Sequence, residues 1–379
     1  MATWKTYRLG DICDYVTTRT ANIENYISTE NMLPNKGGVC TPSNVPSGAT
    51  IEYKVGDILI SNIRPYFKKI WQADCNGACS ADVLCIRANN KADSKYLYYL
   101  LSQQLFFDYV MSGAKGCKMP RGDKKQIMQW QISLPSLEEQ RRIAGILGAI
   151  DDKIECNRRI NANLESQAQA LYKQWFVDNR SDDWEEKSLS EIVFFQEGPG
   201  IRNWQYVEKK GVRFINIRCI NDGDVNVQSA NMISEDEACG KYAHFLLEPL
   251  DIVMSCSGTL GRYAIIRQEH LPLCLNTSVI RFRPAQCIED YSFVYGYLSS
   301  AEFLNKQEEM ACGSVQANFG PTHLKQIKIK VPPKDYRMKY NNVVMPIINT
   351  MLKNRSEINM LSSLRDTLLP KLMNGEIKL

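Results

Sequence analysis

The stretch "LPSLEEQRRIAGILGAIDDKIE", from Leu134 to Glu155, predicts a strand that ends at a proline and then the first turns of a long amphipathic helix. Ser136 stands three residues before Glu139, and this capping-box spacing predicts where the helix begins. From there, apolar or amide residues recur at alternating steps of three and four, which is the period of a heptad seam. The seam positions are Ile143, Leu147, Ile150, Ile154, Asn157, Asn161, Leu164, Ala168, Leu171 and Trp175.

A second seam follows 197 residues later. Its positions are Tyr340, Val344, Ile347, Met351, Asn354, Ile358, Leu361, Arg365, Leu368 and Leu372. Two matched seams in one chain predict two paired helices, and a pseudo-two-fold relation between the halves would make the pair antiparallel. Asn157 and Asn354 share one seam position, so they would meet near the centre and set the register, unless both face solvent where the seam drifts.

The same internal repeat extends along the whole chain. The matched pairs are Trp4 with Trp184, Asp57 with Asp251, and "QISLPS" with "KIKVPP", and the offset grows from 180 to 197. A unit of this length excludes a short-period solenoid, and the drift in offset predicts insertions early in the second copy. The chain is therefore a tandem duplication with diverged halves.

Within each half, short β-branched and aromatic runs lie between Gly, Asn and Asp turns, which predicts a twisted mixed sheet. One aromatic-rich helix interrupts the strands, and its residues 96–109 in the first half favour core packing over a base-stacking platform. The predicted fold is α+β, with two tandem α/β domains separated by two long helices that form an antiparallel coiled coil. The predicted boundaries are 1–135 for the first domain, 136–180 for a helical spacer, 181–333 for the second domain and 334–379 for a C-terminal helix.

Bulk properties exclude several classes of protein. The 379 residues carry a formal net charge of only +4, so a basic surface must be argued locally. The chain shows neither the apolar run of a signal peptide nor about 18 consecutive apolar residues, and we expect no membrane segment. The 13 cysteines are then expected to be reduced thiols, with the cytoplasm as the compartment.

No catalytic assembly stands out in the sequence. Cys75 and Cys79 form one CxxxC without a second pair, and the histidines at 244, 270 and 323 have no ligand spacing. A phosphate-binding GxxxxGK[ST], an HExxH and the [Asn/Asp]-Pro-Pro-aromatic loop of adenine methylation are missing. We interpret "KVPPKD" as a helix-entry turn and "EEK" at 185–187 as a surface charge run, and we predict no catalytic residue, metal or cofactor.

Two segments resemble a known family. "LPSLEEQRRIAGILGAIDDKIECNRRINANLESQAQALYKQWF" resembles the central conserved region of specificity subunits of type I restriction-modification systems, and "LSSLRDTLLPKLMNGEIKL" resembles their C-terminal conserved region. The second copy departs from the first by having "KDYRMKY" in place of the "LEEQ" start. The resemblance covers essentially the whole chain.

The resemblance implies a division of labour. Each globular half is a target recognition domain that reads one half of a split site in double-stranded DNA. The long helices act as a spacer and dock two methyltransferase subunits, and nuclease/translocase subunits join for restriction. The specificity subunit itself performs no chemistry.

Candidate DNA contacts stand in three loops of each half, because Lys and Arg bind phosphate while Arg, Asn and Gln read base edges. In the first half they are Arg19 in an early loop; Arg64, Tyr66, Lys68 and Lys69 after the "GDILIS" strand; and Lys115, Lys118, Arg121, Lys124 and Lys125 before the last strand. In the second half they are Arg202, Asn203 and Trp204; Gly258, Gly261 and Arg262; and Gln316, Asn318, His323 and Lys325. Glycines in such a loop would allow the backbone to approach phosphate closely.

Alternatives stay open at this point. The loops could be ordinary solvated hairpins, and Trp204 could belong to the core. The chain could also be a self-sufficient methyltransferase or nuclease, a coiled-coil scaffold that does not bind DNA, or the recognition module of another restriction class.

Overall fold

The computed structural model describes residues 4–46, 48–116, 118–221, 223–311 and 319–379. The chain divides into two compact units, one formed by Met1–Glu155 with Asn359–Leu379 and one by Cys156–Ile358. Both boundaries fall inside the long helices, so each unit contains a globular half and part of both helices. Each unit is described by itself.

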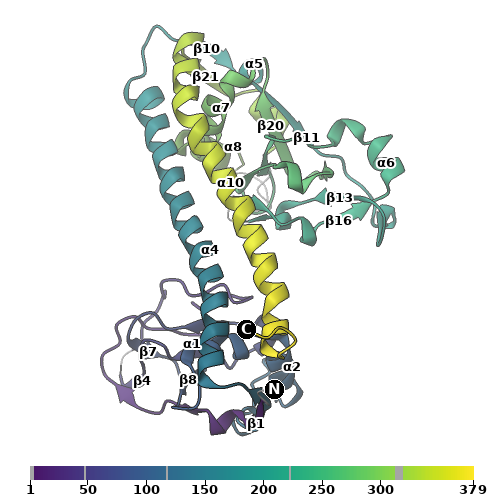
Figure 1. Ribbon diagram of the computed structural model, residues 1–379. Coiled ribbons are helices and arrows are strands. Elements are labelled where there is room, and N and C mark those ends of the chain that lie inside the picture. The colour runs from purple at the N-terminus through teal and green to yellow at the C-terminus, as the bar shows by residue number, and fades with distance from the viewer. Residues whose placement is uncertain (1–3, 47, 117, 222, 312–318) are drawn as a thin grey trace. The chain divides into compact units, whose positions relative to one another are not determined.

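Unit 1 is built on a four-stranded antiparallel sheet (Figure 1). Its strand order is β2 (Cys13–Tyr15), β8 (Val83–Ala88), β5 (Ile58–Ser61) and β6 (Ile70–Gln72). A second sheet joins β3 (Arg19–Thr20), β4 (Thr50–Tyr53) and β7 (Gly77–Cys79), and β1 (Lys5–Arg8) pairs with β9 (Gln131–Leu134). The helices of this half are α1 (Ser94–Leu101), α2 (Gln104–Ser112) and α3 (Lys124–Ile127).

Unit 2 repeats this plan in the same order along the chain. Its main sheet is β11 (Val193–Glu197), β20 (Val279–Pro284), β17 (Ile252–Ser255) and β18 (Tyr263–Ile265), all antiparallel, and β10 (Glu185–Ser188) pairs with β21 (Lys328–Val331). The counterparts of the three helices are α7 (Tyr291–Leu298), α8 (Ala301–Ala311) and α9 (Pro321–Leu324), and α5 (Leu189–Ile192) follows β10. The predicted duplication is therefore confirmed at the level of strand order.

The segment between β11 and β17 contains the predicted insertion, because the offset between the copies grows from 180 before it to 194 at Asp57 and Asp251. It contains β12 (Tyr206–Val207), β13 (Val212–Ile215), β14 (Ile220–Asn221), β15 (Asp224–Val225), β16 (Asn231–Ile233) and α6 (Glu235–Cys239). Strands β12, β16 and β13 form a sheet with β19 (Leu273–Leu275), in which β13 and β19 run parallel. In unit 1 the corresponding segment contributes β3 and β4 to the smaller sheet with β7.

Each half contains the same buried ion pair. Arg87 donates to Asp57 from Nε and Nη2, both at 2.7 Å, and Arg283 donates to Asp251 from the same two atoms at 2.7 and 2.8 Å. Both carboxylates are buried, so the two-pronged arginine supplies the donors that they lose from water. The repeated Asp was visible in the sequence, whereas its arginine partner was not.

The aromatic helices are core elements, as predicted. Tyr96, Tyr99, Phe106 and Phe107 of α1 and α2 are buried in the hydrophobic cluster of unit 1. In unit 2 the matching helix α7 approaches α4 so closely that a Cβ on Gly296 would overlap the ring of Tyr172. That glycine is required for the close approach.

The two long helices are α4 (Leu137–Tyr172), continued by a π-helical turn over Lys173–Asp178, and α10 (Lys334–Met373). The backbone N–H of Glu139 donates to Ser136 Oγ at 3.3 Å, consistent with the predicted helix start. Helix α10 begins directly after the two prolines although it lacks the "LEEQ" start.

The helices pair antiparallel in each unit. In unit 1, Arg365 Nη1 donates to Asp151 Oδ1 at 2.8 Å. In unit 2, partners of rising number in α4 have falling number in α10, since Asn161 meets Asn354 while the ring of Trp175 lies 5.6 Å from that of Tyr340. The predicted antiparallel arrangement is confirmed.

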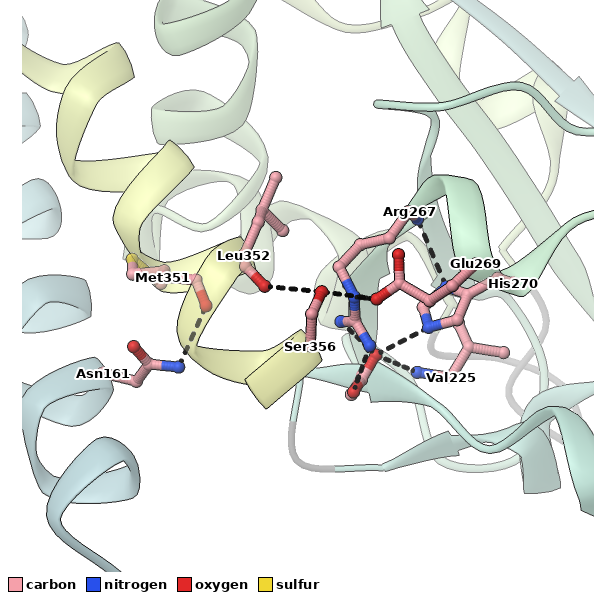
Figure 2. A network of polar contacts seen from close by, with 9 residues as sticks. Asn161, Val225, Arg267, Glu269, His270, Met351, Leu352 and Ser356 are labelled. Carbon is pink, nitrogen blue, oxygen red and sulfur yellow. Dashed lines mark hydrogen bonds and ion pairs between the residues drawn. The ribbon is translucent and has the colours of Figure 1, made fainter. Parts of the chain in front are cut away.

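The predicted direct pairing of Asn157 with Asn354 is wrong by one helical turn. Asn354 Nδ2 donates to Asn161 Oδ1 at 2.9 Å, whereas Asn157 Nδ2 donates to Glu357 Oε2 at 2.9 Å. Asn161 Nδ2 also donates to the backbone oxygen of Met351 at 3.1 Å (Figure 2). Asn157 and Asn161 are buried, so the amides do not face solvent.

The seam positions divide into two groups by burial. Ile143, Leu147, Ile154, Asn157, Val344 and Met351 are buried, and Ile150, Leu164, Leu171, Ile347, Asn354, Ile358, Leu361 and Leu368 are half-buried. Ile348 and Leu352, off the predicted seam, are also buried. The buried face of α10 is wider than a heptad seam because these two residues join the core cluster of unit 2.

A polar network connects β15 and the turn at residues 267–270 to α10 within unit 2 (Figure 2). Arg267 donates to Asp224 from Nη1 and Nη2 at 2.7 and 3.0 Å and to Glu269 from Nε at 2.6 Å. Ser356 of α10 hydrogen-bonds the Glu269 carboxylate. Burial acts to raise the pKa of Asp224, but hydrogen bonds from His270 and Arg267 hold it well below its usual range.

Candidate nucleic-acid interface

In unit 1 two of the predicted loops meet. The backbone N–H of Arg64 donates to the carbonyl of Pro120 at 2.8 Å, and Ile63 forms an isolated β-bridge with Arg121. Arg64 and Lys68 have φ of +51° and +50°, so the chain turns tightly between them. The loop after β5 and the basic loop before β9 thus form one continuous surface, which we name the basic loop pair (residues 62–69, 113–116 and 118–125).

A glycine makes this meeting possible. A Cβ on Gly122 would stand 2.8 Å from Val110 Cγ1 and 2.9 Å from Asn62 Oδ1. The backbone N–H of Gly122 donates to the carbonyl of Asn62 at 3.3 Å, so the two loops approach at this residue. A side chain there would separate them.

The predicted cations of the basic loop pair differ in exposure and in whether they form ion pairs. The exposed ones are Lys115, Lys118, Arg121, Lys124 and Lys125. Lys115 pairs with Asp123 at 3.0 Å and Arg121 with Asp82 at 3.3 Å, whereas no ion pair is recorded for the other three among the residues that the structure describes.

The remaining cations of the basic loop pair are less exposed. Arg64, Lys68 and Lys69 are half-buried, and Lys69 Nζ donates to the carbonyl of Thr29 at 2.7 Å. Tyr66, 47% exposed, stacks at a tilt on Phe67 with the ring centroids 4.7 Å apart. Lys69 therefore contributes mainly to folding of this loop, and Tyr66 faces outward.

Arg19 of β3 lies beside the start of α3. Together with Tyr15, Thr17 and Lys124 it lines a hollow of about 270 Å³. The Tyr15 hydroxyl donates to the carbonyl of Lys124 at 3.1 Å, which fixes the first turn of α3 against β2. The hollow joins the early loop to the basic loop pair.

In unit 2 three loops converge on Cys256, just after β17. Its backbone N–H donates to the carbonyl of Ser278 at 3.0 Å, and its carbonyl accepts from the N–H of Phe319 at 2.8 Å. Residues 257–262 leave directly from it, turning at Gly258 and Gly261, whose φ values are +69° and +76°. These positive angles explain both glycines.

The described side chains of this surface differ in exposure. Arg262 and Lys325 are exposed, whereas His323 is half-buried, accepts from the N–H of Gly320 at Nδ1 (3.1 Å) and stacks on Phe319 at 5.6 Å. The hydrogen bond to His323 therefore caps the start of α9, and this is the main role of its side chain. Gln316 and Asn318 lie outside the described residues.

The early loop of unit 2 projects a tryptophan. Trp204 is 79% exposed, so the alternative that it belongs to the core is wrong, and Arg202 and Asn203 beside it are exposed as well. The next residue, Gln205, is buried: its Oε1 accepts from the N–H of Arg202 at 2.8 Å, and its Nε2 donates to Glu237 at 2.7 Å. A buried glutamine thus anchors a turn that holds the indole in solvent.

The sequence-based prediction missed Glu197, the last residue of β11. Its Oε2 lies 3.7 Å from where a Cβ on Gly320 would stand, which places it beside the converging loops. Burial raises the pKa of Glu197. Burial and then the Glu197 carboxylate also raise the pKa of the Cys256 thiol to about 12. A single acid in "FQEGPG" offered no pattern that could have identified it.

Residues 185–187 form strand β10, where Lys187 pairs with Glu185 at 2.9 Å. Among the described residues, no three His, Cys, Asp or Glu side chains come together as a metal site. Within the same residues, no helix has both the length and the apolar character to cross a membrane.

Comparison with known proteins agrees with this geometry. The family described as type I restriction modification DNA specificity domain matches residues 1–166 and again residues 181–356. The chain is 25% identical over 467 residues to the HindI specificity subunit of Haemophilus influenzae, covering 100% of both chains. It is 26% identical over 304 residues to the MjaIX specificity subunit of Methanocaldococcus jannaschii, covering 75% of this chain and 69% of that one.

A solved structure shares the fold. The S subunit of a type I restriction-modification system from M. genitalium superposes with a TM-score of 0.58, covering 98% of this chain and 96% of that chain. The identity is 16%, so this likeness supports the architecture alone. Two copies of one domain, each followed by a long helix, are the shared plan.

Proposed function

The chain belongs to the type I restriction modification DNA specificity family and has two target recognition domains, and from this premise we propose that it reads a bipartite site in double-stranded DNA. Residues 1–135 and 181–333 would each read one part of the site. Helices of 36 and 40 residues would serve as the spacer between the parts. The specificity subunit performs no chemistry itself, so reading is its contribution.

The observation that carries the proposal is the basic loop pair. Five exposed cations gather on one surface of unit 1 although the whole chain has a net charge of only +4. Local positive charge of this density suits a polyanion, and counterion release would make binding strongly dependent on salt. In unit 2 the loop that matches residues 62–69 turns at Gly258 and Gly261, and the early loop exposes Arg202, Asn203 and Trp204, side chains that suit contacts with bases more than bulk charge.

The proposal includes partners. Two methyltransferase subunits would dock on the long helices and supply methyl transfer, nuclease/translocase subunits would join for restriction, and the complex would work in the cytoplasm. Unit 1 and unit 2 each present part of both helices, so each could hold one methyltransferase subunit. Methyl transfer by the purified single chain, with the methyl donor added, would overturn this division of labour.

The experiment measures DNA affinity of the intact chain against salt concentration. Changing Lys118, Arg121 and Lys124 together to Ala should weaken binding at least tenfold near physiological salt and flatten the slope of log K against log[salt] by about 2–3. The control changes Lys5, Lys54 and Lys91, which are exposed in the same unit and remove the same charge. Equal behaviour of the two triple variants would refute the interface.

A further inference from the structure

The two halves carry different kinds of side chain at one equivalent position. Strand β11 corresponds to β2 at the offset of 180, which places Glu197 where the first half has Thr17. In unit 1, Thr17 lines a hollow with Arg19 and Lys124, so hydrogen-bond donors dominate. In unit 2 the same position, beside the start of α9, holds a carboxylate.

Among the residues that the structure describes, none donates a hydrogen bond to the Glu197 carboxylate. Its backbone pairs with Ile280 of β20, so the strand fixes where the side chain begins. Among the described residues, no hydrogen bond or ion pair to its carboxylate is recorded, and no other acid is recorded near it. Glu197 is half-buried, so solvent reaches its carboxylate and water serves as the donor in the free chain.

A carboxylate that accepts no hydrogen bond from a described residue suits a ligand that carries a donor group. DNA presents amino donors at base edges in the major groove: N4 of cytosine and N6 of adenine. Guanine presents only the acceptors O6 and N7 there, which a carboxylate repels. Adenine sets its N7 acceptor beside the amino group, so an acceptor-only side chain fits cytosine better.

We propose that Glu197 is a specificity-determining residue that accepts a hydrogen bond from the exocyclic amino group of a cytosine in the part of the site read by the second domain. This inference rests on the proposed function. In the complex, the amino group of the correct base would replace the water that solvates the carboxylate in the free chain. Guanine at this position would be rejected, with a discrimination of about ten- to a hundred-fold.

The test selects sequences from a random double-stranded DNA library with the intact chain. The wild type should recover a bipartite motif with cytosine at one position of one half. Glu197→Gln, which offers a donor and an acceptor, should lose the cytosine preference at that position and gain adenine, and every other position should stay unchanged. Glu197→Asp should keep cytosine with weaker selection.

The control is Glu208→Gln, an exposed carboxylate of the same domain with the same charge change. It should select the wild-type motif. An identical motif from the wild type and from Glu197→Gln, or changes at many positions of both halves, would overturn the inference while leaving the proposed function intact. A wild-type chain that recovers no motif at all would overturn both.

Discussion

The amide pair between α4 and α10 makes a quantitative prediction. Asn161 is buried, and its side chain makes two hydrogen bonds across the helix pair, one from Asn354 at 2.9 Å and one to the carbonyl of Met351 at 3.1 Å. Asn161→Ala removes both, leaving the half-buried Asn354 amide without this partner, whereas the Met351 carbonyl keeps its hydrogen bond within α10. Each lost bond is worth roughly 0.5–1.5 kcal/mol, so we expect a destabilisation of about 1–3 kcal/mol.

A double-mutant cycle isolates the pair. Replacing Asn161 and Asn354 together by Leu removes both amides and supplies apolar contact, so the double variant should be more stable than the sum of the single changes predicts. The expected coupling is about 1–2 kcal/mol. Asn157 is the matched control, because it bonds Glu357 instead, and its coupling to Asn354 should stay within about 0.5 kcal/mol.

The assay is hydrogen exchange of the intact chain, read from peptides that cover 156–172 and 340–358. These peptides report the local free energy of opening of the helix pair inside unit 2. A coupling of Asn354 to Asn157 rather than to Asn161 would refute the register. It would also restore the pairing that the heptad positions alone predict.

Two further predictions concern unit 2. If the indole stacks on a base, Trp204→Ala should lower DNA affinity by about 5- to 100-fold in anisotropy titrations, whereas Trp204→Phe should retain most of the affinity. Neither change should shift the melting temperature noticeably, since the side chain is 79% exposed. Wild-type affinity of the Ala variant would contradict this role. Asp224 has a lowered pKa, so its pairing with Arg267 stabilises the fold above the unfolded pKa of about 4 and is lost as the pH falls through the folded value. The melting temperature of Asp224→Asn should therefore lie below that of the wild type at pH 7, with a gap that narrows between pH 5 and pH 2, and a gap independent of pH would count against the ion pair.

The sequence predicted the periodic parts of this fold well. The heptad spacing led to both long helices and their antiparallel pairing, and the offset led to the repeated strand order. The sequence did not reveal that Asn354 pairs with Asn161. Residues 157 and 161 are both asparagines on the seam, one helical turn apart, so the spacing alone cannot choose between them. The burial of Ile348 was missed because it depends on the sheet packed against α10.

The candidate site was less predictable, for a different physical reason. Loops have no period, so the meeting of residues 62–69 with residues 113–116 and 118–125 could not be read from spacing. It depends on long-range backbone bonds and on the space above Gly122. The outward position of Trp204 likewise depends on Gln205, whose buried partners lie far along the chain.

These differences explain how one frame can hold two unlike reading surfaces. The repeated ion pairs, Asp57 with Arg87 and Asp251 with Arg283, lie within the main sheets, and the long helices continue from both halves. The position that carries Thr17 in one half and Glu197 in the other lies at a strand end, where a change of side chain breaks no ladder bond. Because the frame's stability comes from buried pairs and helices, the strand-end and loop residues are free to vary in chemistry. If the chain reads DNA as proposed, a change of sequence preference should require few substitutions, at positions such as Glu197 rather than in the core.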